Sequence, residues 1–236
     1  MLQACLNGAR EAHCHPALPI TPDDLARDAA AVAELGVTHL HLHPRDVLGR
    51  EVLAGPEIAP TVARVRSAVP HVEIGVTTGA WIEPDPDVRV ELVRGWAALA
   101  AGRPDVASVN VHEDGWLAVA EALHAAGIGL ELGVRDDAAA RVLLAAGPPP
   151  GTRRVLVEIP ADHRVAHAER LLDLLAVVDV PILVHGADDS AWPVLNYAVR
   201  RDHATRIGLE DTLSDPDGTP TEGNAALIGH ASLGPS

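Results

Sequence analysis

The sequence contains no lysine, because all 18 of its positively charged side chains are arginine. Without lysine the chain cannot form a Schiff base with a carbonyl substrate, anchor pyridoxal phosphate or supply the lysine of a phosphate-binding loop. Carbon–carbon chemistry in this protein therefore needs a different electron sink.

Positive charge is scarce overall, since 18 arginines face 33 aspartates and glutamates, for a net charge of −15. Nucleic-acid binding depends on clustered basic residues, so the chain is not expected to bind nucleic acid. No apolar run approaches about 18 residues and the start lacks a signal-peptide pattern, so we expect a cytoplasmic protein with no membrane partner. The two cysteines, Cys5 and Cys14, are not expected to form a disulfide in that compartment.

Regular alternation of apolar runs and Ala-rich helical stretches fills the 236 residues. We expect strands at 4–9, 38–43, 72–78, 105–111, 128–134, 154–160, 180–185 and 205–210. We expect helices at 22–35, 57–69, 87–101, 115–126, 136–146, 166–177, 190–201 and 223–232. This alternation implies parallel strands and predicts an α/β fold, a single (β/α)8 TIM barrel over residues 1–236.

An open doubly wound sheet is the alternative fold. That fold usually carries a glycine-rich phosphate fingerprint after its first strand. Here Asn7-Gly8-Ala9-Arg10 contains a single glycine. The closed barrel is therefore favoured, and its active site is expected at the C-terminal ends of the strands.

The strand ends are consistently polar, and the strongest signal is the segment from His39 to Asp46, HLHLHPRD. Alternate residues of a strand point to one face, so His41 and His43 can close on a single ion, while His39 lies deeper and packs in the barrel. The alternative is a pair of hydrogen-bonded barrel histidines without a metal.

A second signal is the segment from Thr205 to Thr212, TRIGLEDT. Alternation places Arg206 and Glu210 on one face, with Asp211 at the rim. Two histidines and Glu210 would form a three-ligand zinc site with an open position. Arg206 beside Asp211 favours the ionised carboxylate.

Other histidines have weaker signals. The segment His13-Cys14-His15 is a competing ligand cluster, although a loop leading into Pro16 is the favoured interpretation. The remaining histidines considered lie in predicted loops or helices without a partner at ligand spacing and are expected at the surface: His112, His163, His167, His203 and His230.

Several segments together resemble the β-keto acid cleavage enzymes, a family also named after 3-keto-5-aminohexanoate cleavage. The resemblance is carried by Asn7-Gly8-Ala9, residues 18–22, His41 to Asp46 with Gly49, Thr77-Thr78-Gly79, and Arg206 to Asp211 with Asn224-Ala225. These matches run in order from residue 3 to residue 228.

The resemblance implies a zinc-dependent (β/α)8 barrel that converts a β-keto acid and acetyl-CoA into acetoacetate and a new acyl-CoA. It implies that His41, His43 and Glu210 hold the zinc and that Asp211 is the general base, tuned by Arg206. Substrate contacts are expected from Arg10, Glu11, Thr77, Thr78, Asn110 and Glu131. Members of the family associate, so a homo-oligomer is expected.

Two departures from the family bear on the substrate. Near position 10 the family has a glutamate that contacts a substrate amine. If Arg10 aligns with that glutamate, an acidic or neutral β-keto acid is favoured. If a one-residue gap aligns Glu11 instead, the glutamate is kept. The second glutamate of the family after strand five is Gly133 here, while Glu131 is kept. The roles of Glu158 and His185 stay open.

Two other functions fit parts of the pattern. Metal-dependent hydrolases of TIM-barrel fold also use His-x-His, but they add histidines from strands five and six, where this sequence has Glu131 and Glu158. A non-catalytic barrel that keeps the metal as a structural element and binds a small acid is the other alternative. The Arg206–Asp211 pair argues against it, because a structural metal needs no base.

Overall fold

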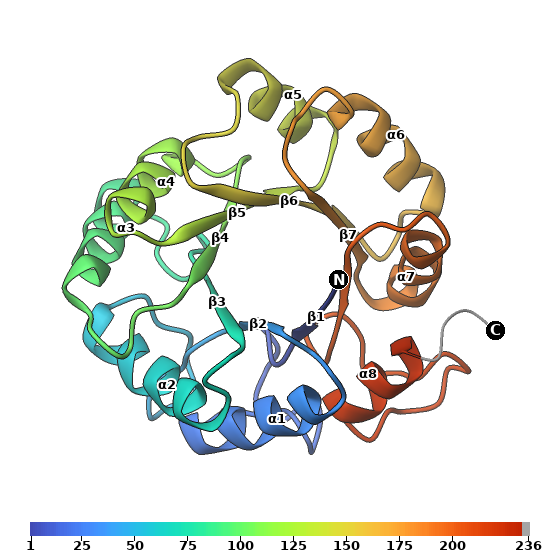
Figure 1. Ribbon diagram of the computed structural model, residues 1–236, viewed down its shortest axis with the longest axis horizontal. Helices are drawn as coiled ribbons and strands as arrows, with labels where there is room; N and C mark the ends of the chain where they lie inside the picture. The colour runs from blue at the N-terminus through green and yellow to red at the C-terminus, as the bar shows by residue number, and fades with distance from the viewer. Residues whose placement is uncertain (233–236) are drawn as a thin grey trace.

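Eight parallel strands alternate with eight α-helices in residues 1–232, the part of the chain that the computed structural model describes (Figure 1). The strands are β1 (Leu2–Cys5), β2 (His39–Leu42), β3 (Glu73–Thr77), β4 (Val106–Asn110), β5 (Gly129–Val134), β6 (Thr152–Ile159), β7 (Ile182–Gly186) and β8 (Thr205–Ile207). The helices are α1 (Pro22–Glu34), α2 (Gly55–Ala68), α3 (Pro86–Arg94), α4 (Trp116–Ala125), α5 (Asp137–Ala146), α6 (Val165–Leu175), α7 (Ala191–Arg200) and α8 (Asn224–Ser232).

The sheet closes on itself. Its strand order is β7-β6-β5-β4-β3-β2-β1-β8, and each strand pairs in parallel with the neighbour in that order. Strands β7 and β8 meet through a parallel bridge between Leu183 and Ala204, and the Val184 amide donates to the Ala204 carbonyl at 2.9 Å. The prediction of a (β/α)8 barrel is confirmed, and the open sheet is excluded.

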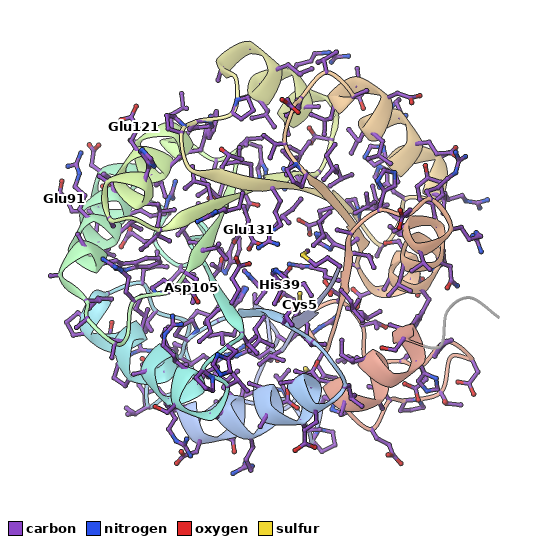
Figure 2. The ribbon with its side chains drawn as sticks, viewed as in Figure 1. Cys5, His39, Glu91, Asp105, Glu121 and Glu131 are labelled. Carbon is purple, nitrogen blue, oxygen red and sulfur yellow. The ribbon has the colours of Figure 1, made fainter. Side chains whose placement is uncertain are left out.

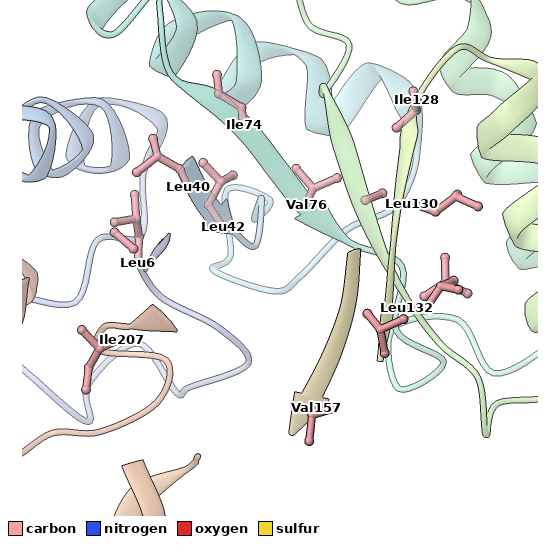
Figure 3. Close-up of a cluster of buried hydrophobic side chains, with 14 of the residues drawn as sticks. Leu6, Leu40, Leu42, Ile74, Val76, Ile128, Leu130, Leu132, Val157 and Ile207 are labelled. Atoms are coloured by element: carbon pink, nitrogen blue, oxygen red, sulfur yellow. The ribbon is translucent and has the colours of Figure 1, made fainter. Parts of the chain in front are cut away.

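Strand residues alternate between the helix layer and the barrel interior. Leu40 and Leu42 of β2 are fully buried and pack in the apolar layer together with Ile74 and Val76 of β3 (Figure 3). The residues that alternate with these point inward, as Figure 2 shows for His39, which precedes Leu40. The same alternation that builds the apolar layer therefore directs the polar residues to the barrel axis.

The barrel interior below the strand ends is unusually polar. TIM barrels are normally filled by layers of branched apolar side chains. Here Glu131, which Figure 2 places inside the ring, accepts a hydrogen bond from Gln3 Nε2 at 2.9 Å and lies 2.8 Å from Arg154 Nε. Arg154 also pairs with Glu73 of β3. A network of two carboxylates, one guanidinium and one amide thus links four strands inside the barrel.

The first helix begins where the sequence predicts it. The Thr21 hydroxyl accepts a hydrogen bond from the Asp24 amide, the Asp24 carboxylate accepts one from the Thr21 amide, and Pro22 occupies the first turn. This capping box satisfies donors that a helix start otherwise leaves free. Among residues 1–232, no helix is both long and apolar enough to span a membrane.

The first and eighth strands end well before their predicted ends. The first was expected over 4–9 but ends at Cys5, because the Asn7 side chain pairs with the His43 backbone and Gly8 turns the chain at φ +55°. The eighth was expected over 205–210 but ends at Ile207, because the Leu209 amide donates to the Asn224 side chain instead of to a neighbouring strand.

The third helix was also predicted too long, over 87–101. It ends at Arg94, and a 3-10 turn follows at Gly95–Ala98. The tighter turn accompanies the full burial of Trp96, whose indole N–H donates to the Leu53 carbonyl at 2.8 Å.

Candidate metal centre and active-site cavity

A cavity of about 220 Å³ lies at the C-terminal ends of the strands, where the fold predicts an active site. Side chains from β2 to β8 line it. The residues that line it include His41, His43, Asn110, Glu158, Arg206 and Glu210. The volume accommodates a small organic acid but not a whole coenzyme A, which would extend outside it.

His41, His43 and Glu210 converge on one point of this cavity. The two histidine Nε2 atoms are 3.1 Å apart, and Glu210 Oε2 lies 3.9 Å from His41 Nε2 and 3.8 Å from His43 Nε2. Ligands around a tetrahedral zinc ion are roughly 3.3 Å apart, given metal–ligand bonds of about 2.0–2.2 Å. The three atoms therefore fit one metal ion.

Two further observations favour metal binding at this point. Glu210 Oε2 is buried and has no hydrogen-bond partner among residues 1–232, which is costly for a carboxylate oxygen unless a cation meets it. His41 is buried, and burial lowers its pKa to about 3, so its imidazole is neutral, as a metal ligand must be.

Glu210 is ionised. Burial alone would raise the pKa of its carboxyl, but the Arg206 guanidinium lowers it well below its usual range. Arg206 Nη2 donates to Glu210 Oε1 at 2.9 Å. That contact leaves Oε2 to face His41 and His43.

A loop residue fixes the ring of His43. Glu51 Oε1 lies 2.5 Å from His43 Nδ1, so Nδ1 carries the proton and Nε2 is free for a metal. The Trp81 indole N–H donates to both Glu51 oxygens at 3.2 and 3.1 Å, and its ring stacks on His43. Burial alone would raise the pKa of Glu51, but the contacts with His43 and Trp81 lower it.

The buried carboxylate of Glu131 lies close to the ring of His41. His41 Nδ1 lies 3.9 Å from Glu131 Oε2, and neither atom has a hydrogen-bond partner among residues 1–232. Gly75 pairs with His41 in the register, and a Cβ there would approach Glu131 Oε2 to 3.3 Å. The missing side chain of Gly75 makes room for this carboxylate beside the ligand.

Gly8 supports Glu210 from the first loop. Its φ of +55° is a conformation that other residues rarely adopt, and a Cβ at this position would lie 2.4 Å from Glu210 Cγ. The buried Arg45 holds this loop by donating from Nη2 to the Gly8 and Arg10 carbonyls at 2.8 and 2.6 Å. The segment that contains His41 and His43 therefore also holds the loop against which Glu210 packs.

Asp211 lies behind the cavity wall. It is 1% exposed, does not line the cavity, and accepts a hydrogen bond from Arg206 Nη2 at 2.9 Å. His185 of β7 does line the cavity, and its Nδ1 lies 3.6 Å from Asp211 Oδ1. The base expected from the family resemblance therefore faces a histidine rather than the open cavity.

The six expected substrate contacts divide into two groups. Thr77 and Asn110 line the cavity. The other four do not: Thr78 donates to the Ser108 carbonyl at 2.7 Å, Glu131 is in the interior network, Arg10 pairs with Asp188 at 2.5 Å and donates to the Leu209 carbonyl at 3.0 Å, and Glu11 lies 3.2 Å from His13 Nε2 in an exposed position.

Some cavity residues were missed or left without a role. His112 is exposed, as expected, but it also lines the cavity together with Arg135, Glu158 and His185. Glu51 and Trp81 had no signal, because they reach the site from loops. His185 and Glu158 did have a signal in the sequence, since each stands near the C-terminal end of a predicted strand.

Two other expectations about histidines are settled. His167, expected at the surface, is buried and its Nε2 lies 3.0 Å from the Arg135 carbonyl oxygen, a correction that follows from its place on the inner face of α6. In the competing cluster, His15 Nε2 lies 3.0 Å from the Thr221 carbonyl, whereas His13 and Cys14 are exposed. The residues of that segment belong to a loop, as favoured.

Comparison with known proteins identifies the relatives of this chain. A sequence profile described as beta-keto acid cleavage enzyme matches residues 1–232. The apo structure of ObcA has a TM-score of 0.68 and 18% identity, over 92% of this chain and 61% of that chain. The ternary complex of ObcA with a C4-CoA adduct and oxalate has a TM-score of 0.68 and 17% identity, over 92% and 63%.

The barrel fold extends to proteins of other kinds. The structure of 3-dehydroquinate dehydratase from Enterococcus faecalis has a TM-score of 0.62 and 13% identity, over 87% of this chain and 88% of that chain. At such identities these structures show a common fold and no more. The chain spans less than two thirds of the length of the ObcA structures that it matches.

Proposed function

This chain belongs to the beta-keto acid cleavage enzyme family, and we propose that it converts a β-keto acid and acetyl-CoA into acetoacetate and a new acyl-CoA. One observation carries the proposal. A three-ligand group, His41, His43 and Glu210, opens onto the same cavity as Arg206, which holds the buried Asp211. The complexes of ObcA with oxaloacetate and with a C4-CoA adduct support an acid and a CoA ester as ligands.

We propose a divalent metal, zinc in the first instance, at His41, His43 and Glu210. The donor set consists of the neutral imidazole of His41, the imidazole of His43 that Glu51 orients, and the ionised carboxylate of Glu210. These donors are those of a catalytic zinc site, with one position left for substrate. A metal there would polarise the keto oxygen of the substrate and stabilise the negative charge that develops on it.

The other cavity residues orient the acid. Asn110 and Thr77 line the cavity and offer an amide and a hydroxyl to the substrate carboxylate. Arg135 and His112 also line the cavity and favour an acidic group on the substrate side chain. The arginine at position 10 plays no part in this, because it pairs with Asp188 outside the cavity.

The reaction then follows the chemistry of a carbon acid. The α-proton passes to the carboxylate of the Arg206–Asp211 pair. The resulting enolate attacks the thioester carbonyl of acetyl-CoA, which forms a carbon–carbon bond and releases CoA thiolate. The thiolate attacks the original keto carbon and breaks the older carbon–carbon bond. The proton returns to the leaving enolate, which becomes acetoacetate.

The experiment measures metal and turnover in the same samples. Elemental mass spectrometry is applied to the wild type and to the His41→Ala and Glu210→Ala variants, and each protein is incubated with acetyl-CoA and a panel of linear, branched and dicarboxylic β-keto acids. We expect near-stoichiometric zinc and a new acyl-CoA in the wild type and neither in the variants. His39→Ala is the matched control, because His39 is on the same strand face but pairs with Glu73 away from the cavity.

Different results point to the alternatives. Zinc that is indifferent to both substitutions would overturn the proposed metal site. Zinc bound at this site without acyl-CoA formation, together with hydrolysis of an ester or amide, would indicate the hydrolase. An Arg206→Ala variant that keeps zinc but loses turnover would exclude a purely structural metal.

A further inference from the structure

Trp81 lies on the boundary between the active-site cavity and a second hollow of the surface. It lines the cavity of about 220 Å³ at the strand ends, and it also lines a groove of about 580 Å³. The residue is 53% exposed, so its ring is not part of the buried core. Because both hollows share this one ring, its position decides whether they form one space or two.

The ring of Trp81 is held in place by three contacts. A Cβ at Gly79 would lie 2.2 Å from two of its ring carbons, so the ring packs directly against the backbone of that residue. The indole N–H donates to both oxygens of Glu51 at 3.2 and 3.1 Å. The ring also stacks on His43, with the centroids 6.2 Å apart and the planes at 21°. The boundary between the two hollows is therefore preformed.

The chemistry of the groove indicates what it could hold. Apolar side chains line part of it, and each belongs to the core or packs against it: Val52, Leu53, Ile82 and Leu92. Its charged side chains leave it negative, because Arg50 already pairs with Asp46 at 2.7 Å and Glu57 and Glu83 have no arginine partner among residues 1–232. An anionic group such as the nucleotide of CoA is disfavoured there, whereas an alkyl chain suits the apolar residues.

We propose that Trp81 restricts this site to β-keto acids with short side chains, because its ring closes the cavity off from the apolar groove. The inference rests on the proposed function. The cavity, at about 220 Å³, is smaller than the roughly 300–1,000 Å³ of pockets that enclose larger ligands. A longer alkyl chain has to leave the cavity into water, so its added methylene groups stay hydrated and bring no affinity.

Leu156 of β6 is the competing candidate for this role. It also lines the cavity with an apolar side chain, but it does not line the groove. Removal of the Leu156 side chain enlarges the cavity without joining it to the apolar groove. The two residues are therefore compared directly.

The test uses two linear acids, 3-oxopentanoate and 3-oxooctanoate, which differ by three methylene groups. Their binding to protein supplied with zinc is measured by isothermal titration calorimetry without acetyl-CoA, so that no carbon–carbon bond forms. In separate samples with acetyl-CoA, the formation of propanoyl-CoA or hexanoyl-CoA is followed by mass spectrometry. Zinc content is measured in every variant, because Trp81 stacks on His43.

We expect the wild type to bind the two acids with similar affinity. Trp81→Ala is expected to bind the longer acid about 60-fold more tightly than the shorter one, since a buried methylene group contributes about 4-fold in affinity. The ratio of the two kcat/KM values is expected to move in the same direction. Trp81→Phe keeps a ring at this position and should keep the wild-type ratio, whereas Leu156→Ala should not reach the ratio of Trp81→Ala.

Two further variants guard against an effect of lost packing. Gly79→Ala displaces the ring without removing an atom of it, so we expect a partial preference for the longer acid. Trp192→Ala is the matched control, because the indole of Trp192 also donates a hydrogen bond, to the Ser214 carbonyl at 2.8 Å, but does not line the cavity. It should keep the wild-type ratio.

The failures are distinguishable. Similar affinities for the two acids in a Trp81→Ala protein that keeps its zinc would overturn the size limit, and so would a preference for the longer acid in the wild type or its appearance in Leu156→Ala alone. If Trp81→Ala loses its zinc, Gly79→Ala decides the question in its place. A wild type that binds the acids but forms no acyl-CoA overturns the proposed function, while the two affinities still decide the role of Trp81. A wild type that binds neither acid overturns both.

Discussion

Glu51 supplies a quantitative prediction about the proposed metal centre, because it contacts the proposed ligand His43 without being a ligand itself. Its carboxylate lies 2.5 Å from His43 Nδ1 and sets both the tautomer and the orientation of that ring. Loss of such a supporting group typically weakens metal binding 10–100-fold. Glu51→Gln keeps a neutral acceptor, so we expect about a 10-fold rise in the zinc Kd, and Glu51→Ala removes the acceptor, so we expect about a 100-fold rise. These changes correspond to about 1.4 and 2.7 kcal/mol.

Zinc affinity is measured by competition with a chromophoric chelator at fixed pH and ionic strength. Glu57→Gln and Glu57→Ala are the matched controls, because Glu57 is exposed on α2 a short distance along the chain. Thermal unfolding of each metal-free variant tests whether the fold is kept. A Kd for Glu51→Ala within twofold of the wild type would refute the reasoning, as would an equal rise in the Glu57 variants.

Three further changes test the support of the site and the barrel. Gly8→Ala is expected to displace Glu210 and lower zinc content, because its Cβ would lie 2.4 Å from Glu210 Cγ and its φ of +55° is strained for alanine. Asp28→Asn is expected to remove a pH dependence of stability, because burial raises the pKa of Asp28 to about 6. The wild type is therefore stabilised below pH 4 and loses at most about 3 kcal/mol of its free energy of unfolding as the pH rises to 6. Urea unfolding at pH 4 and pH 7 measures this loss. Arg154→Met is expected to lower the free energy of unfolding by about 3–5 kcal/mol in the same assay, because Glu131 would be left as an unpaired buried charge.

Each of these changes has a control in the chain. Gly36 has a φ of +91° and no atom near the position of an added Cβ, so Gly36→Ala tests backbone strain without displacement of Glu210. Equal zinc loss in both glycine variants would contradict the explanation. Asp179→Asn, at an exposed position, should leave the pH dependence intact. Arg153→Met alters the exposed neighbour of Arg154, and an equal loss of stability there would argue against the buried ion pair.

The barrel could be predicted from the sequence because its signal is repeated in every strand. Leu40 and Leu42 alternate with His39 and His41, and that period of two determines both which side meets the helices and which side faces the axis. The three proposed metal ligands were predicted by the same logic, since His41 lies within a strand and His43 and Glu210 follow the ends of strands. Their convergence is an outcome of strand register.

The groups around the ligands could not be predicted in this way. Glu51 reaches His43 across a loop that returns on itself through a bridge between Arg45 and Glu51, and no periodicity describes such a loop. Arg10 and Glu11 lie outside the cavity because Gly8 turns the chain just before them. Asp211 was placed at the rim, but the early end of β8 carries it behind His185.

The ion network inside the barrel bears on how this protein can be divided or assembled. Gln3 and Glu73 come from the first half of the chain, and Glu131 and Arg154 from the second. A fragment that ended after β4 would keep the carboxylate of Glu73 and lose its guanidinium partner, and the complementary fragment would lose the amide that bonds Glu131. We therefore expect that neither half folds alone and that split versions of this protein assemble only when both halves are produced together. A circular permutation that keeps all the strands in one chain preserves every one of these contacts.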